Sequence, residues 1–221
     1  MERRLAAILS YDAVGYTLAI GKDETVTLAA VKSHRREIID PNAEQHGGRT
    51  IKLMGDGALM EFASAVDAVG FAVAMQQAMS VHNAGLPEEQ RLLYRIGINI
   101  GDVVVDGGDI FGDGVIIADR LQKLAEPGGI TIHQNVRDQL RGKLNLDFDD
   151  LGEVEIKNIE RPVRAFRVTL NEKAAAIAAR PDQRTPKPKR PARIWQAENK
   201  TFARFPNWRW AAAAILIAVI V

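Results

Sequence analysis

Two aspartates stand where a carboxylate could bind a metal ion. Asp12 ends the apolar run LAAILSY, and Asp56 lies between two glycines in the run LMGDGALM. Mg²⁺ in proteins is usually held by one or two carboxylates together with substrate phosphates. The pair therefore predicts a metal–nucleotide site, although an aspartate in a Gly-Asp-Gly turn is more often only a turn residue.

The composition narrows the chemistry that is open to this chain. Its 221 residues are 47% hydrophobic and 26% charged, which is typical of one globular domain with an appendage. The absence of cysteine excludes a thiolate nucleophile, a disulfide scaffold and a zinc–thiolate site. The four histidines show no metal-binding spacing. The chemistry that remains possible is therefore the binding of a hard cation by carboxylates.

Charge is distributed unevenly along the chain. The formal net charge is +1, but residues 171–221 hold ten Lys and Arg against three Asp and Glu, so that segment carries +7 and residues 1–170 carry −6. A phosphate backbone needs a basic binding face. We therefore expect no nucleic-acid partner for the acidic region.

The change in charge coincides with a change in composition, which suggests three parts. Residues 1–170 read as one domain and residues 171–207 as a basic, Pro-rich linker. Trp208 and Trp210 then precede eleven apolar residues, which predicts that residues 208–221 begin a transmembrane helix that continues beyond this chain. The basic linker would keep the domain cytoplasmic, tethered to the inner membrane. The alternative is a buried or disordered hydrophobic end.

Hydrophobic periodicity predicts the elements that must position Asp12 and Asp56. We expect strands over 5–12, 94–100, 103–105, 130–133, 154–157 and 165–170, a hairpin turn at 55–57 and a Gly/Asp-rich loop at 106–114. Helices are expected from about Asp23, with Pro41 disturbing the end, over 64–83 and over 115–125. This order predicts an α+β, ferredoxin-like or palm-type sandwich, in which helices cover a mostly antiparallel sheet.

Five segments of the chain also follow a known pattern in order and spacing. They are AAILSYDAVGYT, GGRTIKLMGDGALMEF, RIGINIGDVVVDGGDIFGDGV, ADRLQKLAEPGGI and LGEVEIKNIERPVRAFRV. Together they resemble the catalytic domain of bacterial class III adenylate cyclases over residues 3–168. The resemblance implies the class III cyclase fold, conversion of ATP into 3′,5′-cyclic AMP and pyrophosphate, two Mg²⁺ or Mn²⁺ ions, and a head-to-tail homodimer with shared active sites.

The resemblance also implies roles for single residues. The metal ligands would be Asp12 and Asp56 with Ala13 beside them, and the turn from Ala13 through Gly15, Tyr16 and Thr17 would cradle the phosphates. Lys52 and Asp109 would read adenine, since a donor to N1 and an acceptor from the 6-amino group suit that base. Arg120 would stabilise the transition state, from the second protomer, and Lys157 would contact the triphosphate.

Two positions depart from the family pattern. Ile116 stands where the family usually has asparagine, which orients the ribose and the arginine, and Asp119 stands where a small residue is usual. The alternative is therefore a weak or inactive cyclase-like domain that acts as a nucleotide-binding regulatory module. A diguanylate cyclase is disfavoured, because Ile110 and Phe111 do not continue the signature that Gly107-Gly108-Asp109 begins.

Overall fold

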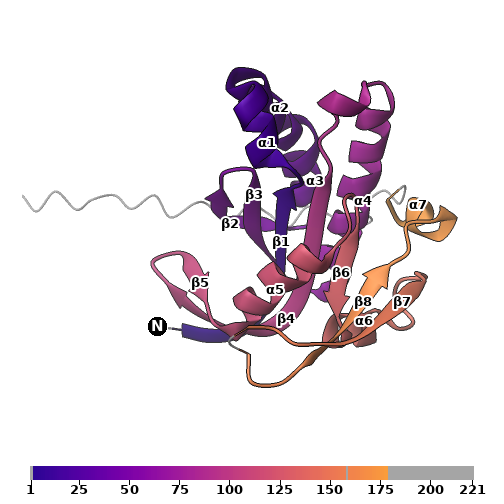
Figure 1. Cartoon of the computed structure of the whole chain (residues 1–221). Coiled ribbons are helices and arrows are strands. Elements are labelled where there is room, and N and C mark those ends of the chain that lie inside the picture. The colour runs from indigo at the N-terminus through magenta and orange to yellow at the C-terminus, as the bar shows by residue number, and fades with distance from the viewer. Residues whose placement is uncertain (1, 158, 179–221) are drawn as a thin grey trace, which may run out of the picture. The chain divides into compact units, whose positions relative to one another are not determined.

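The apolar run at the start of the chain forms the strand β1 (Glu2–Ala13), which lies inside one sheet. A computed structural model describes residues 2–157 and 159–178 (Figure 1). The eight strands of this part form a sheet in the order β2-β3-β1-β4-β6-β8-β7, and β5 pairs with β4 off this path. The other strands are β2 (Arg49–Met54), β3 (Gly57–Phe62), β4 (Tyr94–Asp106), β5 (Asp109–Phe111), β6 (Ile130–His133), β7 (Phe148–Val154) and β8 (Val163–Val168).

Strand directions confirm the predicted fold class. Among the strand pairs of the described chain, only β4–β6 is parallel, and the others are antiparallel. The helices are α1 (Tyr16–Lys22), α2 (Glu24–His34), α3 (Asp40–Gln45), α4 (Ala65–Ala84), α5 (Asp113–Leu124), α6 (Gln134–Leu140) and α7 (Glu172–Ala178), with the π-helix η1 (Arg35–Ile39) and the 3₁₀-helix η2 (Glu88–Gln90). The result is the α+β arrangement with a mostly antiparallel sheet that we expected.

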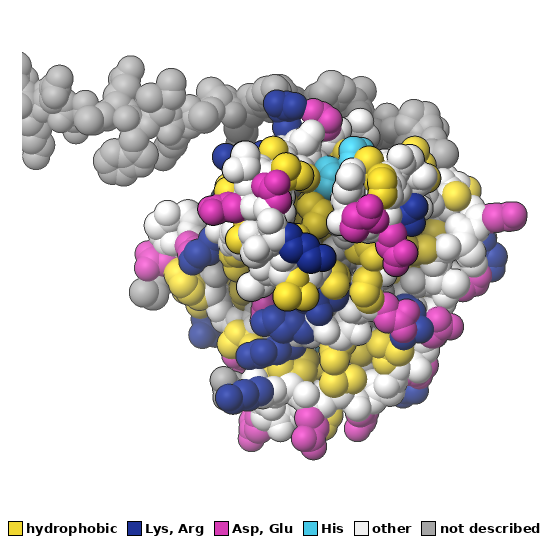
Figure 2. All heavy atoms as spheres, turned by 45° about the horizontal axis from the view of Figure 1, so that its top comes forward, with side chains coloured by type: hydrophobic (Ala, Val, Ile, Leu, Met, Phe, Trp, Pro, Cys, Tyr) yellow, Lys and Arg dark blue, Asp and Glu magenta, His cyan; other side chains and the backbone are white. Residues whose placement is uncertain are grey.

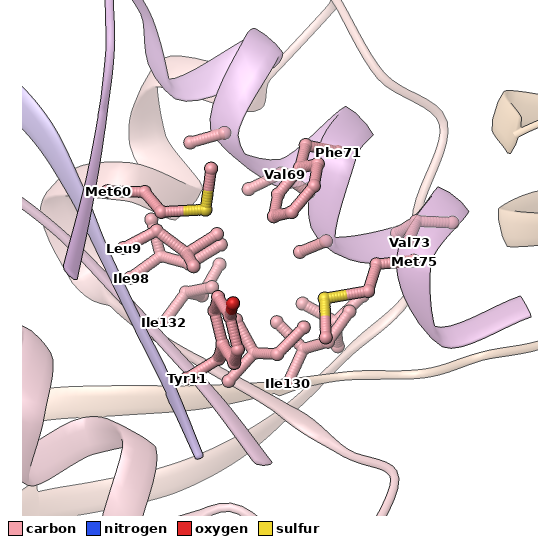
Figure 3. Packing of buried hydrophobic residues seen from close by; sticks show 14 of the residues in the cluster. Leu9, Tyr11, Met60, Val69, Phe71, Val73, Met75, Ile98, Ile130 and Ile132 are labelled. Atoms are coloured by element: carbon pink, nitrogen blue, oxygen red, sulfur yellow. The ribbon is translucent and has the colours of Figure 1, made fainter. Parts of the chain in front are cut away.

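Alternation along the strands separates two faces of the sheet. In β1, Leu9 and Tyr11 point into the larger core, whereas Ala6 and Ile8 point to the opposite face. The larger core packs under α4, whose buried side chains meet those of β1, β3, β4 and β6 (Figure 3). Helix α5 covers the other face and crosses in front of β1 and β4 in Figure 1.

Several predicted boundaries were wrong. The strands expected at 94–100 and 103–105 are one continuous strand, β4, because β1 pairs with it along its whole length. The strand expected at 154–157 is β7 instead, which ends at Val154. Part of the expected loop at 106–114 forms β5 and the start of α5.

Pro41 does not end the helix that begins near Asp23. Asp23 caps α2 by accepting from the Val26 N–H at 3.0 Å, and the chain stays helical to Gln45. The π-helix η1 widens one turn just before the proline, with the Asp40 N–H bonded to the Arg35 carbonyl. Pro41 then stands in the first turn of α3, where no intrahelical N–H bond is needed.

Ordered structure continues past Leu170, where we placed the end of the domain. Residues 172–178 form α7, which packs against α4 and buries Ala174 and Ile177. The first residues of the expected linker therefore belong to the folded domain. The rest of the linker and the transmembrane helix expected at 208–221 lie outside the described residues. Among the described helices, none is long and apolar enough to span a membrane.

A buried histidine joins α2 to α4 and β4. His34 is 3% exposed, its Nδ1 lies 3.1 Å from the Tyr94 hydroxyl, and its Nε2 lies 3.2 Å from Nε2 of His82. Burial, and secondarily the charge of the neighbouring His82, lower the pKa of His34 to about 4, whereas Glu37 acts in the opposite direction. The folded domain therefore holds this imidazole neutral at neutral pH.

We expect the domain to lose stability in mild acid. Unfolded His34 binds a proton with a pKa near 6.5 and the folded form only near 4, so its contribution is complete above pH 6.5 and is lost as the pH falls towards 4. The loss should reach on the order of 3 kcal/mol. Urea unfolding at pH 7.5, 6.0 and 4.5 measures it.

The variant His34→Gln provides the comparison. It should be less stable than the parent at pH 7.5, because the contact with Tyr94 is changed, but its stability should fall less steeply with acid. An equal slope in His34→Gln and the parent would contradict this account.

Candidate active site

Asp12 lies near the end of β1 and is held by an arginine on the neighbouring strand. Arg95 is its register partner on β4. The Arg95 Nε donates to Oδ1 of Asp12 at 3.1 Å, and Nη2 donates to Oδ2 at 2.8 Å. These hydrogen bonds raise the pKa of Arg95 above its ordinary value. A bidentate pair of this kind fixes the carboxylate in direction as well as in charge.

Asp56 reaches the same site from the turn between β2 and β3. Gly55 has φ +73°, and a Cβ on Gly57 would lie 2.0 Å from the Tyr11 carbonyl oxygen, so only glycine lets this turn approach β1 so closely. Oδ2 of Asp56 accepts from the Ala13 N–H at 3.3 Å. Two carboxylates that are 44 residues apart in the sequence therefore meet at the end of β1.

The electrostatics of Asp56 reflect this crowding. Burial is the main cause that raises the pKa of its carboxyl, and the charge of Asp12 raises it further. Hydrogen bonds from backbone N–H groups and the charge of Arg95 act in the opposite direction. A pair of oxygen ligands with incompletely compensated negative charge fits a hard divalent cation.

The protein would supply only part of such an ion's coordination. Among the described residues, no group of three or more His, Cys, Asp or Glu side chains is placed to hold a metal. Mg²⁺ commonly combines one or two carboxylates with waters and substrate phosphates. The two aspartates therefore fit an ion that arrives with a phosphate ligand better than a permanently caged ion.

The turn after β1 leads directly into α1. The N–H of Ala13 donates to Asp56 and the N–H of Val14 donates to the Leu93 carbonyl at 2.8 Å. The N–H groups of Gly15, Tyr16 and Thr17 follow at the start of α1, where a helix leaves its first donors without intrahelical partners. Gly15 has φ +71°, Tyr16 packs partly against the core and Thr17 is exposed.

Lys52 and Asp109 meet although 57 residues separate them. Nζ of Lys52 lies 3.2 Å from Oδ2 of Asp109, and both side chains are accessible to solvent. Lys52 is on β2, the strand that leads into the Asp56 turn, and Asp109 begins β5. The N–H of Ile110 and then Lys52 lower the pKa of Asp109. A donor and an acceptor thus stand side by side at the surface.

The remaining predicted residues are Arg120 and Lys157, and no hydrogen bond or ion pair in the described chain joins either of them to the two aspartates. Arg120 is half-buried on α5, and its Nε is buried without a hydrogen-bond partner in the described chain. Lys157 is exposed after β7. Within the described residues neither cation forms an ion pair with Asp12 or Asp56. The single chain therefore assembles the aspartates and the Lys52–Asp109 pair, but not Arg120 and Lys157.

The two departures on α5 have different surroundings. Asp119 forms an ion pair with Lys123, one turn further on, at 2.7 Å. Lys123, and not Arg120, therefore partly compensates the charge of Asp119. Ile116 is 36% exposed, which is unusual for a large apolar side chain on the flank that also carries Arg120. This flank therefore presents apolar surface beside a charged group.

Arg95 is the residue of this site to which our sequence analysis gave no role. It lies in the segment RIGINIG, but nothing in its spacing indicates that it faces Asp12. The signal is the antiparallel register of β1 and β4, which only the fold supplies.

Figure 2 turns forward the end of the molecule that lies at the top of Figure 1, and Lys and Arg side chains gather in the middle of this view.

Comparison with known proteins places this geometry in a family. The family model of the adenylate and guanylate cyclase catalytic domain matches residues 5–169. The chain belongs to this cyclase family. The cyclase domain is also 43% identical over 189 residues to "Putative adenylate cyclase 3" of Rhizobium meliloti, a match that covers 84% of this chain and 32% of that protein. An adenylate cyclase of Streptomyces coelicolor is 28% identical over 140 residues, covering 63% of this chain and 35% of that protein.

Solved structures agree with the assignment. The adenylate/guanylate cyclase/hydrolase from Silicibacter pomeroyi is 44% identical, with a TM-score of 0.72, and the match covers 76% of this chain and 97% of that one. The adenylyl cyclase CyaB from P. aeruginosa shares the fold at 24% identity and a TM-score of 0.63, covering 76% and 96%. The chain spans 19% to 35% of the length of the curated relatives that it matches.

We expect Arg95→Gln to bind Mn²⁺ more tightly than the parent cyclase domain when nucleotide is absent. Arg95 occupies both oxygens of Asp12, so an ion must compete with it, and removing the positive charge should raise affinity roughly three- to tenfold. Calorimetric titration with MnCl₂ measures this without any turnover. Arg167→Gln, which breaks an exposed ion pair with Glu126, should leave Mn²⁺ affinity unchanged. Equal or weaker binding by Arg95→Gln would contradict the competition.

Proposed function

We propose that this domain is an adenylate cyclase, which converts ATP into 3′,5′-cyclic AMP and pyrophosphate. The observation that carries the choice of ATP is the contact between Lys52 and Asp109. Adenine offers an acceptor at N1 and a donor at its 6-amino group, which matches an ammonium beside a carboxylate. Guanine offers the opposite pattern at these positions and would face two mismatched groups.

The reaction is a displacement at the α-phosphorus. The ribose 3′-oxygen forms a bond to that phosphorus, the bond to the bridging oxygen of pyrophosphate breaks, and the 3′-hydroxyl proton passes to solvent. Asp12 and Asp56, with Ala13 beside them, would hold two Mg²⁺ or Mn²⁺ ions, which supply charge stabilisation for the attacking and leaving oxygens when they are bound. Use of divalent metal ions is general in this family.

The phosphates have backbone and cationic partners in this proposal. The turn through Gly15, Tyr16 and Thr17 offers N–H groups to phosphate oxygens. Arg95, which binds Asp12 in the free domain, would leave its positive charge beside the site when an ion takes its place. The backbone N–H groups and the positive charge of Arg95 would both attract a polyphosphate, and neither requires a change in the fold.

Arg120 and Lys157 would act from a second protomer. Neither cation forms an ion pair with an aspartate of its own site among the described residues, and Nε of Arg120 has no partner there. In a head-to-tail homodimer each site would combine Asp12, Asp56 and the Lys52–Asp109 pair of one chain with Arg120 of the other. There the arginine would stabilise negative charge that develops on the phosphates.

The activity assay is the direct test. The chain incubated with MnCl₂ and ATP should form cyclic AMP, and with GTP it should form little cyclic GMP. Asp56→Asn should lower turnover roughly 10²- to 10³-fold, because a metal ligand loses its charge. Asp23→Asn, a substitution at the helix cap of α2, is the matched control and should remain active. Turnover unchanged in Asp56→Asn would remove the mechanism.

Shared sites make a quantitative prediction about mixtures. Asp56→Asn and Arg120→Ala should each be nearly inactive alone. Mixed in equal amounts, half of the dimers combine one chain of each kind, and each of these has one intact site, so activity should recover to about a quarter of the parent value. Co-purification of the Arg120→Ala chain with an affinity-tagged Asp56→Asn chain confirms mixing. A mixture as inactive as its components would mean that each chain carries a complete site or that the chains do not pair.

A second candidate function is a nucleotide-binding regulatory module, favoured by the exposed apolar side chain of Ile116 beside Arg120. If the domain is a slow enzyme, Ile116→Asn should raise kcat roughly 10- to 100-fold, because a polar side chain can then orient the ribose and the arginine. Ile116→Val serves as the apolar control. ATP binding by calorimetry with no product from either the parent or Ile116→Asn would favour the module.

A further inference from the structure

A cavity of about 460 Å³ lies on the side of the sheet opposite Asp12. It is bounded by the last turns of α4, by Arg91 and Leu93 just before β4, by Tyr94 at the start of β4, and by Gly128 and Leu170. Tyr94 lines it and belongs to the larger core, whereas the next residue, Arg95, contacts Asp12. Because successive residues of a strand point to opposite faces, the cavity and the aspartate site lie back to back across β4.

One wall of the cavity carries a buried acceptor without a partner. Asn83 is 5% exposed, and its Nδ2 donates to the Leu92 carbonyl at 2.9 Å. Its Oδ1 is buried and accepts no hydrogen bond within the described chain. An unsatisfied buried oxygen is destabilising, and a donor supplied from the cavity would remove that cost.

The mouth of the cavity carries a cation that forms no ion pair in the described chain. Arg91 is exposed and lines the cavity, and its Nε donates to the Leu86 carbonyl at 2.8 Å. Its remaining guanidinium donors are available to an anion. Helix α4 ends at this place, and the partial negative charge of its last carbonyls disfavours an anion deep in the cavity. An anionic group would therefore sit at Arg91, at the mouth.

Apolar side chains complete the cavity. Met79 is buried in its wall, and Leu93 and Leu170 each expose 40% of their surface there. Gln76 fixes the inner end, since its Nε2 donates to the carbonyls of Tyr94 at 2.8 Å and Gly129 at 3.1 Å. The cavity thus has apolar walls, one buried acceptor in a wall and one cation at its mouth.

We propose that this cavity is a second ligand site, which binds a small organic anion with an apolar body and an N–H or O–H donor. The apolar body would pack on Met79, Leu93 and Leu170, and the anionic group would pair with Arg91. The donor would reach Oδ1 of Asn83 once neighbouring side chains shift, because less than 1 Å² of that oxygen is accessible in the free domain. A volume near 460 Å³ lies in the range of small-molecule sites. The proposal does not depend on the cyclase activity.

The test uses 8-anilinonaphthalene-1-sulfonate, which combines a sulfonate, two aromatic ring systems and an amine N–H. The full chain should bind this dye at one saturable site with enhanced fluorescence. Ser80→Trp places a large side chain at the exposed position 80 of the lining and should weaken binding at least tenfold. Arg91→Gln should weaken it roughly five- to tenfold, because a charged hydrogen bond is lost.

Val81→Trp is the matched control. Position 81 is the next residue of α4, is 77% exposed and does not line the cavity, so the same added side chain should leave dye affinity unchanged. Thermal unfolding followed by circular dichroism establishes that all three variants fold. Equal affinity for the parent, Ser80→Trp and Arg91→Gln, or binding that does not saturate, would overturn the proposal, since the dye would then bind elsewhere.

Discussion

The site depends on the close approach of the β2–β3 turn to the end of β1. Gly57 permits it, since any Cβ there would overlap the Tyr11 carbonyl oxygen at 2.0 Å. The approach brings Asp56 to the Ala13 N–H and so to Asp12. A turn even one residue longer, or with a side chain at position 57, would separate the carboxylates and remove the electrostatic basis for binding a cation.

Bringing two carboxylates together costs free energy because their negative charges repel, and the fold compensates this cost mainly at Asp12. Arg95 neutralises Asp12 through two hydrogen bonds, while Asp56 has only backbone donors and a raised pKa. The arginine thus stands in for an ion when no ion is bound, because it keeps the like charges from repelling the turn away from β1. In the proposed mechanism the same group would weaken metal binding until nucleotide adds its own negative charge.

How much of this could be predicted from the sequence differs from residue to residue. Asp12 and Asp56 were recognisable from apolar runs that end at a turn, because strand ends and hairpins have local signals. The contact of Lys52 with Asp109 spans 57 residues and came from family resemblance, since no local pattern encodes it. Arg95 was missed because cross-strand register is a property of the sheet. Strand β7 was misplaced because it is an edge strand with a bulge before Gly152, and its acidic residues do not alternate with apolar ones.

The single chain leaves one donor of the proposed mechanism without an acceptor. Nε of Arg120 is buried and unpaired among the described residues, which is costly for a guanidinium. The neighbouring Asp119 does not compensate it, because its carboxylate pairs with Lys123. Ile116, one turn earlier, cannot accept a hydrogen bond at all. An acceptor from outside α5 is therefore needed, and in the proposed dimer the phosphates held by the partner's aspartates would meet that need at the moment when charge develops on them. The same unpaired donor that destabilises the isolated chain would then stabilise the transition state.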